Sequence, residues 1–253
     1  MTKKPTSRGP ARVPGKASTV RSTSASASTA KSPSGSTRSL TVTLRKSHKK
    51  TTSQQAWLAR QLNDPYVVAA KAQGWRSRAA FKLIELDDKF KLIKPESRVV
   101  DLGAAPGGWT QVAIKRGALE VVGVDLLPMD KIAGAKLIEG DFNDPEMPGI
   151  LTGLLGGKAD LVLSDMAPNT TGHAATDHLR IIALAEMALE FAMEILAPGG
   201  AFVAKVFQGG TEKDMLAPMK KHFALVRHAK PPASRKESSE LYVVATGFRG
   251  GRA

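Results

Sequence analysis

A glycine-rich turn is the segment whose residue types first suggest a bound ligand. It reads Val99-Val-Asp-Leu-Gly-Ala-Ala-Pro-Gly-Gly-Trp109, an apolar run that leads into Gly103, Gly107 and Gly108. Glycines let a backbone pass close to a ligand because they carry no Cβ. The turn lacks the spacing of phosphate-binding glycine loops, and Asp101 just before it would repel a phosphate. The sequence therefore favours a cationic ligand without phosphate, such as S-adenosylmethionine.

Two more acids end the next apolar runs along the chain. Asp125 ends VVGVD, where an acid can accept hydrogen bonds from ribose hydroxyls, and Asp141 ends LIEGD, within reach of an adenine amine. Any one such acid is more often a helix N-cap. Together with Asp101 they make three acids at successive strand ends around one glycine turn, and this repetition favours a cofactor site.

Asp165 and Lys205 are the candidates for acting on a methyl acceptor. Lys205 lies inside the apolar run Ala201–Phe207, and burying an ammonium is costly unless it is paired or deprotonated. The alternative is a lysine that extends from an edge strand to water, but its apolar neighbours indicate a central strand. Asp165, in the loop Ser164–Gly172, could hold the lysine. A ribose hydroxyl is a weak nucleophile that needs such a base or orienting charge.

The composition excludes several other chemistries. The chain contains no cysteine, which rules out disulfides, thiolate metal sites and the cysteine attack that methylation of pyrimidine carbon 5 requires. The Ser164–Gly172 loop also lacks the aromatic residue that enzymes acting on exocyclic base nitrogens commonly use to stack a flipped base. An oxygen acceptor is therefore favoured, and we expect no metal.

Alternating apolar runs and helical patterns predict an α/β fold with a mostly parallel sheet covered by helices on both faces. Helices are expected from Ser53, after Pro65, after a Ser77 N-cap, and over 177–196 before Pro198-Gly-Gly. The last two runs have no helix between them, which predicts an antiparallel hairpin at one edge. The predicted strands are Arg98–Asp101, Glu120–Val124, Lys136–Glu139, Ala159–Ser164, Ala201–Phe207, Leu225–Arg227 and Leu241–Thr246.

Charge divides the chain into a tail and a body. The formal charge is +14, and residues 1–50 contribute +12 of it because they hold 12 Lys or Arg and no acid. This Ser/Thr-rich tail cannot bury enough apolar surface to fold and is predicted to be disordered. Three interpretations of this tail remain open: an arm that binds RNA, a tail without a specific role, or a transit peptide. Residues 51–253 are predicted to form one domain of a soluble, cytoplasmic protein.

Several motifs in order and spacing resemble the FtsJ-type heat-shock methyltransferases. The resemblance covers about residues 60–249 and rests on SRAAFKL, DLGAAPGGW, DLLPMD, GDF, SDMAPN, LAPGG, FVAKVFQG and ELYVVATG. It implies a Rossmann-like class I methyltransferase that uses S-adenosyl-L-methionine. It also implies a Lys-Asp-Lys-Glu tetrad, which falls on Lys82, Asp165, Lys205 and Glu240. The same resemblance places Gly107, Trp109, Asp125, Asp141 and Asp165 at the cofactor, while Ala80 departs from the aromatic residue of some relatives.

The resemblance further implies 2′-O-methylation of a uridine in the A-loop of 23S ribosomal RNA, within the large ribosomal subunit. The alternatives are an RNA-binding assembly factor without activity, a tRNA 2′-O-methyltransferase, and a nicotinamide-dependent oxidoreductase, against which Asp101 argues. A monomer is favoured. RNA contacts are expected from Arg76, Arg78, Lys82 and the segment 227–236, for which a solvated basic loop is an equal alternative.

Overall fold

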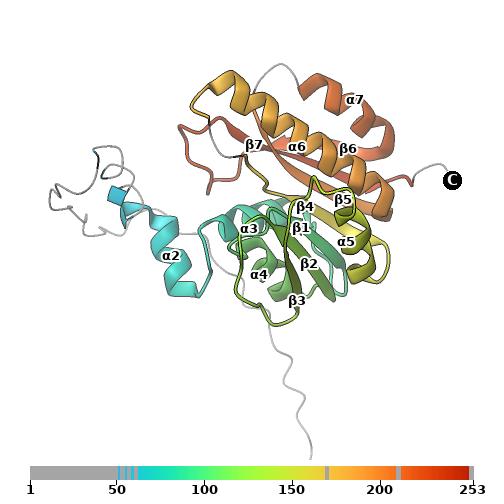
Figure 1. Cartoon of the computed structure of the whole chain (residues 1–253), viewed down its shortest axis with the longest axis horizontal. Coiled ribbons are helices and arrows are strands. Elements are labelled where there is room, and N and C mark those ends of the chain that lie inside the picture. The colour runs from blue at the N-terminus through green and yellow to red at the C-terminus, as the bar shows by residue number, and fades with distance from the viewer. Residues whose placement is uncertain are drawn as a thin grey trace, which may run out of the picture.

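The computed structural model describes Thr51, Gln55 and residues 58–59, 62–168, 171–208 and 212–250 (Figure 1). The predicted tail, residues 1–50, lies outside the described residues, as does much of the helical pattern that begins at Ser53. The glycine turn and all seven predicted strands lie within them.

One seven-stranded sheet organises the described residues, in the order β3-β2-β1-β4-β5-β7-β6. Strands β1 to β5 run parallel, and β7 pairs antiparallel with both β5 and β6. The predicted parallel sheet with an antiparallel edge hairpin is thereby confirmed. The strands are β1 (Arg98–Leu102), β2 (Glu120–Asp125), β3 (Ala135–Glu139), β4 (Ala159–Ser164), β5 (Leu196–Phe207), β6 (Phe223–Ala229) and β7 (Glu240–Phe248).

Helices cover both faces of this sheet (Figure 1). They are α2 (Pro65–Gln73), α3 (Ala79–Phe90), α4 (Gly108–Lys115), α5 (Met147–Leu155), α6 (Ala174–Ile195) and α7 (Glu212–His222). Strand residues alternate between two cores: Leu161 and Leu163 pack with α2, α3 and α4, whereas Val162 packs with α5, α6 and α7. This alternation follows from the two-residue period of a strand and decides which helix each site residue faces.

The predicted starts of one helix and one strand are wrong, and the structure shows the reason for each. The N-cap of α3 is Arg78, whose backbone is already helical, and not Ser77. The Ser77 hydroxyl has no hydrogen-bond partner because it is packed against Gly108, where an added Cβ would lie 2.6 Å from it. Strand β5 starts at Leu196, before Pro198-Gly-Gly, because it pairs with β4 on both sides of a register shift in the ladder. Proline and glycine are tolerated at such irregularities.

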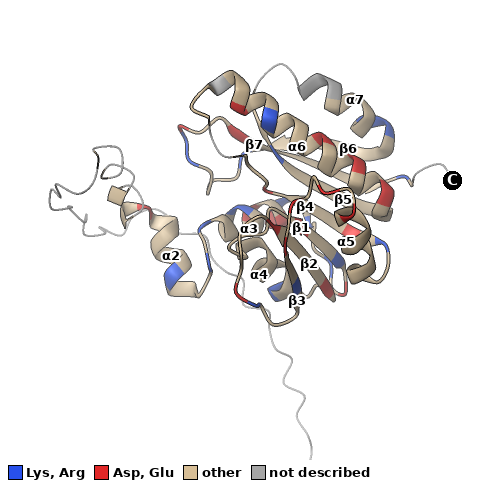
Figure 2. Cartoon of the chain, in the orientation of Figure 1, with Lys and Arg blue, Asp and Glu red and all other residues tan. Residues whose placement is uncertain are grey.

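Charges of both signs are distributed over the described elements (Figure 2). This distribution agrees with the near balance of acids and bases in residues 51–253. None of the helices among the described residues is long and apolar enough to cross a membrane. In that same part of the chain, no group of three or more His, Cys, Asp or Glu side chains is placed to hold a metal ion.

The edge strand β6 offers a direct test of the packing. Phe223 is 1% exposed and packs against Phe248 at 5.2 Å between ring centroids, whereas Leu225 on the same strand is 42% exposed. Phe223→Ala should lower the free energy of unfolding by about 3–5 kcal/mol because it leaves a cavity. Leu225→Ala should change it by no more than about 0.5 kcal/mol. Equal losses in urea titrations would contradict this assignment of the core.

Candidate active site

An ion pair joins the carboxyl ends of β4 and β5. Asp165 directly follows β4, and Lys205 lies near the end of the adjacent β5. The Lys205 ammonium lies 3.0 Å from Asp165 Oδ1 and donates a 2.6 Å hydrogen bond to the Asp165 carbonyl. Lys205 is only 9% exposed. Strand β5 lies between β4 and β7, so the alternative of a lysine extending from an edge strand is wrong.

A second ion pair lies on the same side of the sheet. Lys82 in α3 places its ammonium 2.8 Å from the Glu240 carboxylate at the start of β7. Ser234 donates a 2.7 Å hydrogen bond to the same carboxylate, at Glu240 Oε1. The structure therefore brings together the four residues that the resemblance assigned to the tetrad, although sequence reading alone treats Lys82 as an ordinary helix-surface lysine.

Tyr242 connects the two ion pairs. Its hydroxyl donates to Asp165 Oδ1 at 2.8 Å and accepts from the Lys82 ammonium at 3.1 Å. It stands directly opposite Lys205 in the antiparallel β5–β7 ladder. Tyr242 was not among the site residues predicted from the sequence. The signal was available, because Tyr242 follows Glu240 by two positions in a strand, and side chains two positions apart share a face.

The charges in this cluster fix its protonation. Burial raises the pKa of Asp165, but Lys205, Lys82 and the hydrogen bonds from Lys205 and Tyr242 outweigh it, so the pKa lies below its usual value. Burial, together with Asp165 and Glu240, holds the pKa of Tyr242 well above 10. Asp165 is therefore a carboxylate and Tyr242 a neutral phenol at neutral pH, which agrees with the hydrogen bond that Tyr242 donates.

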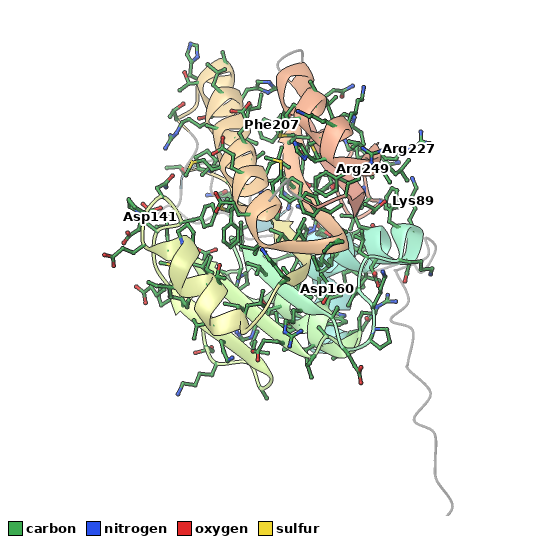
Figure 3. All side chains as sticks on the ribbon, turned by 90° about the vertical axis from the view of Figure 1, so that its right-hand side faces the viewer. Lys89, Asp141, Asp160, Phe207, Arg227 and Arg249 are labelled. Atoms are coloured by element: carbon green, nitrogen blue, oxygen red, sulfur yellow. The ribbon has the colours of Figure 1, made fainter. Side chains whose placement is uncertain are left out.

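A cavity of about 390 Å³ lies at the carboxyl ends of β1 and β2. Three of the predicted cofactor residues line it: Gly103, Asp125 and Asp141. Gly103 adopts φ +77°, and a Cβ there would lie 2.8 Å from the Met166 backbone, so only glycine fits. Asp141 is exposed at the edge of the molecule (Figure 3) and accepts hydrogen bonds from Asn143 in a local turn.

The remaining glycine-turn residues do not line this cavity. Gly107, at φ +103°, is the N-cap of α4, and Gly108 packs against Ser77. The Trp109 side chain is buried, donates to the Ala79 carbonyl at 2.8 Å and packs on Tyr242 at 5.6 Å between centroids. The side chain of Trp109 thus links α4 to α3 and supports the tetrad.

Asp101 is buried within β1, beneath the glycine turn, at 1% exposure. It accepts a 2.7 Å hydrogen bond from Thr110, while its other oxygen has no partner. Burial, reinforced by Asp165 and Asp125, raises its pKa to about 7 despite the hydrogen bond from Thr110. Asp101 does not line the cavity, so it can act on a ligand there only through its charge.

A second cavity, of about 870 Å³, adjoins the first. Ala167 and Pro168 line both cavities, and they follow Asp165 in the SDMAPN segment. Lys205 and Glu240 line the second cavity only. The structure therefore offers two adjacent spaces that share a wall, one lined by Gly103 of the glycine turn and the other by Lys205.

The cations expected to contact RNA are largely engaged within the protein. Arg78 pairs with Asp64 at 2.9 Å and also donates to the Ala233 carbonyl. Arg76 donates to three backbone carbonyls, and Lys82 pairs with Glu240. Half of the residues in the segment 227–236 are exposed, among them Arg227, Lys230 and Lys236. The expectation of an RNA contact therefore falls mainly on these three bases.

Comparisons with known proteins agree on one family. The model of the FtsJ-like methyltransferases matches residues 75–248. The chain is 66% identical over 250 residues to ribosomal RNA large subunit methyltransferase E of Gluconobacter oxydans, covering 95% of this chain and 91% of that protein. It is 75% identical over 208 residues to the protein of the same name in Granulibacter bethesdensis, covering 82% of this chain and 90% of that protein. A solved ribosomal RNA methyltransferase of Plasmodium falciparum has a TM-score of 0.62 and 31% identity, covering 70% of this chain and all of that one.

The raised pKa of Asp101 predicts a dependence of stability on pH. The folded chain holds this proton up to about pH 7, whereas the unfolded chain releases it near pH 4. The stabilisation is complete below pH 4 and is lost as the pH rises to 7, to an extent on the order of 2–4 kcal/mol. Asp101→Asn should remove this loss. Urea titrations of both proteins at pH 4 and pH 8 measure it, and a difference independent of pH would contradict the assignment.

Proposed function

The chain belongs to the FtsJ-like methyltransferase family, and from that membership we propose that it methylates a ribose 2′-hydroxyl of large-subunit ribosomal RNA with S-adenosylmethionine. The observation that carries the proposal is the Lys205–Asp165 pair beside the wall shared by the two cavities. An ammonium fixed at that position can direct an acceptor oxygen toward a methyl donor held in the adjacent cavity.

The first cavity fits the proposed cofactor in size and charge. Its volume of about 390 Å³ lies within the usual range for small-molecule sites. Asp125 and Asp141 would hold the ribose and adenine, since each carboxylate oxygen can accept more than one hydrogen bond. Asp101 beneath the turn has a pKa of about 7, so it is partly ionised at neutral pH, and a bound cationic ligand would favour its ionised form. S-adenosylmethionine would supply a methyl group already activated by its positive sulfur.

Lys205 is proposed to act on the acceptor hydroxyl. An ammonium has three donors, and two of them are used by the carboxylate and carbonyl of Asp165. The third remains for the acceptor cavity, which Lys205 lines. As an ammonium it would hold the 2′-oxygen in line, and as a neutral amine it would accept the hydroxyl proton. Asp165 keeps the direction of the lysine fixed in either state.

Lys82, Glu240 and Tyr242 are proposed to hold the other side of the acceptor. Lys82 pairs with Glu240 and donates to Tyr242, which in turn donates to Asp165. Hydrogen bonds and ion pairs therefore connect Glu240 to Lys205 without a break. Such a continuous network restrains each side chain in one geometry, as positioning within a fraction of an ångström requires.

Ribosomal RNA is the substrate class that the relatives support. Two bacterial relatives at 66% and 75% identity carry the name ribosomal RNA large subunit methyltransferase E. The finer assignment, a uridine in the A-loop of 23S ribosomal RNA, rests on the resemblance of the motifs. Residues 1–50, with 12 bases and no acid, are proposed to add electrostatic affinity for RNA that is independent of sequence.

Lys205→Met tests the proposed mechanism. It keeps the apolar length of the side chain and removes the charge that would act on the acceptor. Single-turnover transfer from radiolabelled S-adenosylmethionine to large ribosomal subunits should slow by at least about 10²-fold, while cofactor affinity changes little. Lys136→Met is the matched control and should keep the parental rate, because Lys136 on β3 is exposed and pairs with Glu120 on β2, away from the site.

Two results would contradict the proposal. A Lys205→Met protein that methylates ribosomal RNA at the parental rate would remove Lys205 from the mechanism. A parental protein that binds ribosomal RNA but transfers no methyl group would instead favour an assembly factor without activity. Transfer to tRNA in place of ribosomal RNA would leave the mechanism intact and change the substrate.

A further inference from the structure

Arg76 lies in the short connection between α2 and α3, and its side chain joins two loops. Its guanidinium donates hydrogen bonds to the carbonyls of Pro106 (3.1 Å), Asp130 (2.7 Å) and Lys131 (2.9 Å). Pro106 belongs to the glycine turn, whereas Asp130 and Lys131 lie in the segment 126–134 that follows β2. One cation therefore connects the two loops that meet at the first cavity.

Asp125 connects the same two loops with the opposite charge. Its Oδ2 accepts from the Ala105 amide and its Oδ1 from the Leu127 amide, both at 2.9 Å. The glycine turn and the segment 126–134 are thus joined twice, by a carboxylate through their N–H groups and by a guanidinium through their carbonyls. Asp125 also lines the cavity proposed for the cofactor.

The backbone of Arg76 is itself fixed. Its amide donates to Gln111 Oε1 in α4 at 2.8 Å, and Gln111 Nε2 donates to the Gly74 carbonyl at 3.2 Å. The loops are packed closely around the guanidinium, because a Cβ on Gly107 would lie 2.5 Å from Ile132 and 3.1 Å from Arg76 Nη1. Arg76 therefore has little freedom to turn toward solvent or RNA.

We propose that Arg76 is a positioning residue for the cofactor, holding the segment 126–134 against the glycine turn so that Asp125 and Leu126 keep their places in the cavity wall. This inference rests on the proposed function, since it assumes S-adenosylmethionine in that cavity. The role requires the arginine side chain, because Nη1 donates to carbonyls of both loops and Nη2 adds the Lys131 carbonyl. A lysine carries the same charge but ends one bond short of these nitrogens and lacks the planar fork.

Arg76→Lys separates this role from an RNA contact. By calorimetry, the full chain carrying it should bind S-adenosylhomocysteine about tenfold more weakly, which corresponds to about 1.4 kcal/mol. The KM for S-adenosylmethionine should rise by a similar factor, while kcat and the KM for ribosomal RNA stay unchanged. Arg116→Lys is the matched control, because Arg116 also bridges two elements but pairs with Asp87 and Asp88; its affinity should stay parental.

The outcomes are distinguishable. Parental affinity for S-adenosylhomocysteine in Arg76→Lys overturns the inference alone, whereas no binding by the unsubstituted chain overturns the proposed cofactor and this inference with it. A second measurement needs no ligand: backbone hydrogen exchange in the segment 126–134 should be faster in Arg76→Lys than in Arg116→Lys. Equal exchange rates in that segment would also overturn the inference.

Discussion

The buried pair of Lys205 and Asp165 is the interaction on which the rest of the site depends. Each charge alone would be costly away from water, and their attraction offsets this only when further hydrogen bonds satisfy both groups. The Asp165 carbonyl and the Tyr242 hydroxyl supply those bonds. The pair therefore requires a fixed end of β4, a buried β5 and a tyrosine on β7, and the seven-stranded sheet supplies all three.

The period of the strands explains why the cluster assembles on one face. Lys205 and Tyr242 are opposite each other in the β5–β7 ladder, and Val203 and Val244, two positions away on the same face, pack toward α3. Lys82 enters from α3 and reaches Glu240 at the start of β7. The other face, which packs against α5, α6 and α7, contributes to the core but supplies none of the four tetrad residues.

The alternation of apolar runs and helical patterns was sufficient to predict the sheet and its edge hairpin, and the apolar setting of Lys205 revealed the buried lysine. The motifs placed Lys82 and Glu240 only through their resemblance to a family. The role of Tyr242 was not predicted, because a tyrosine in a strand usually packs in the core. The hydrogen bonds and the ion pair of Arg76 and Arg78 within the protein were not predicted either. Their partners are backbone carbonyls and a carboxylate distant in the sequence, which residue types alone do not reveal.

The basic residues of the chain fall into two groups, those that hold the structure around the site and those that remain for RNA. Residues 51–253 are nearly neutral, and Arg76 beside the site joins two loops, so the general attraction for RNA is proposed to come from the basic tail and from the exposed bases of the segment 227–236. The cluster around Lys205 is proposed to methylate a ribose oxygen. The most direct measurement is a map of 2′-O-methylation across ribosomal RNA from cells with and without the gene. We expect the loss of one methylated uridine in the A-loop of 23S ribosomal RNA, whereas an unchanged map would contradict the proposed activity.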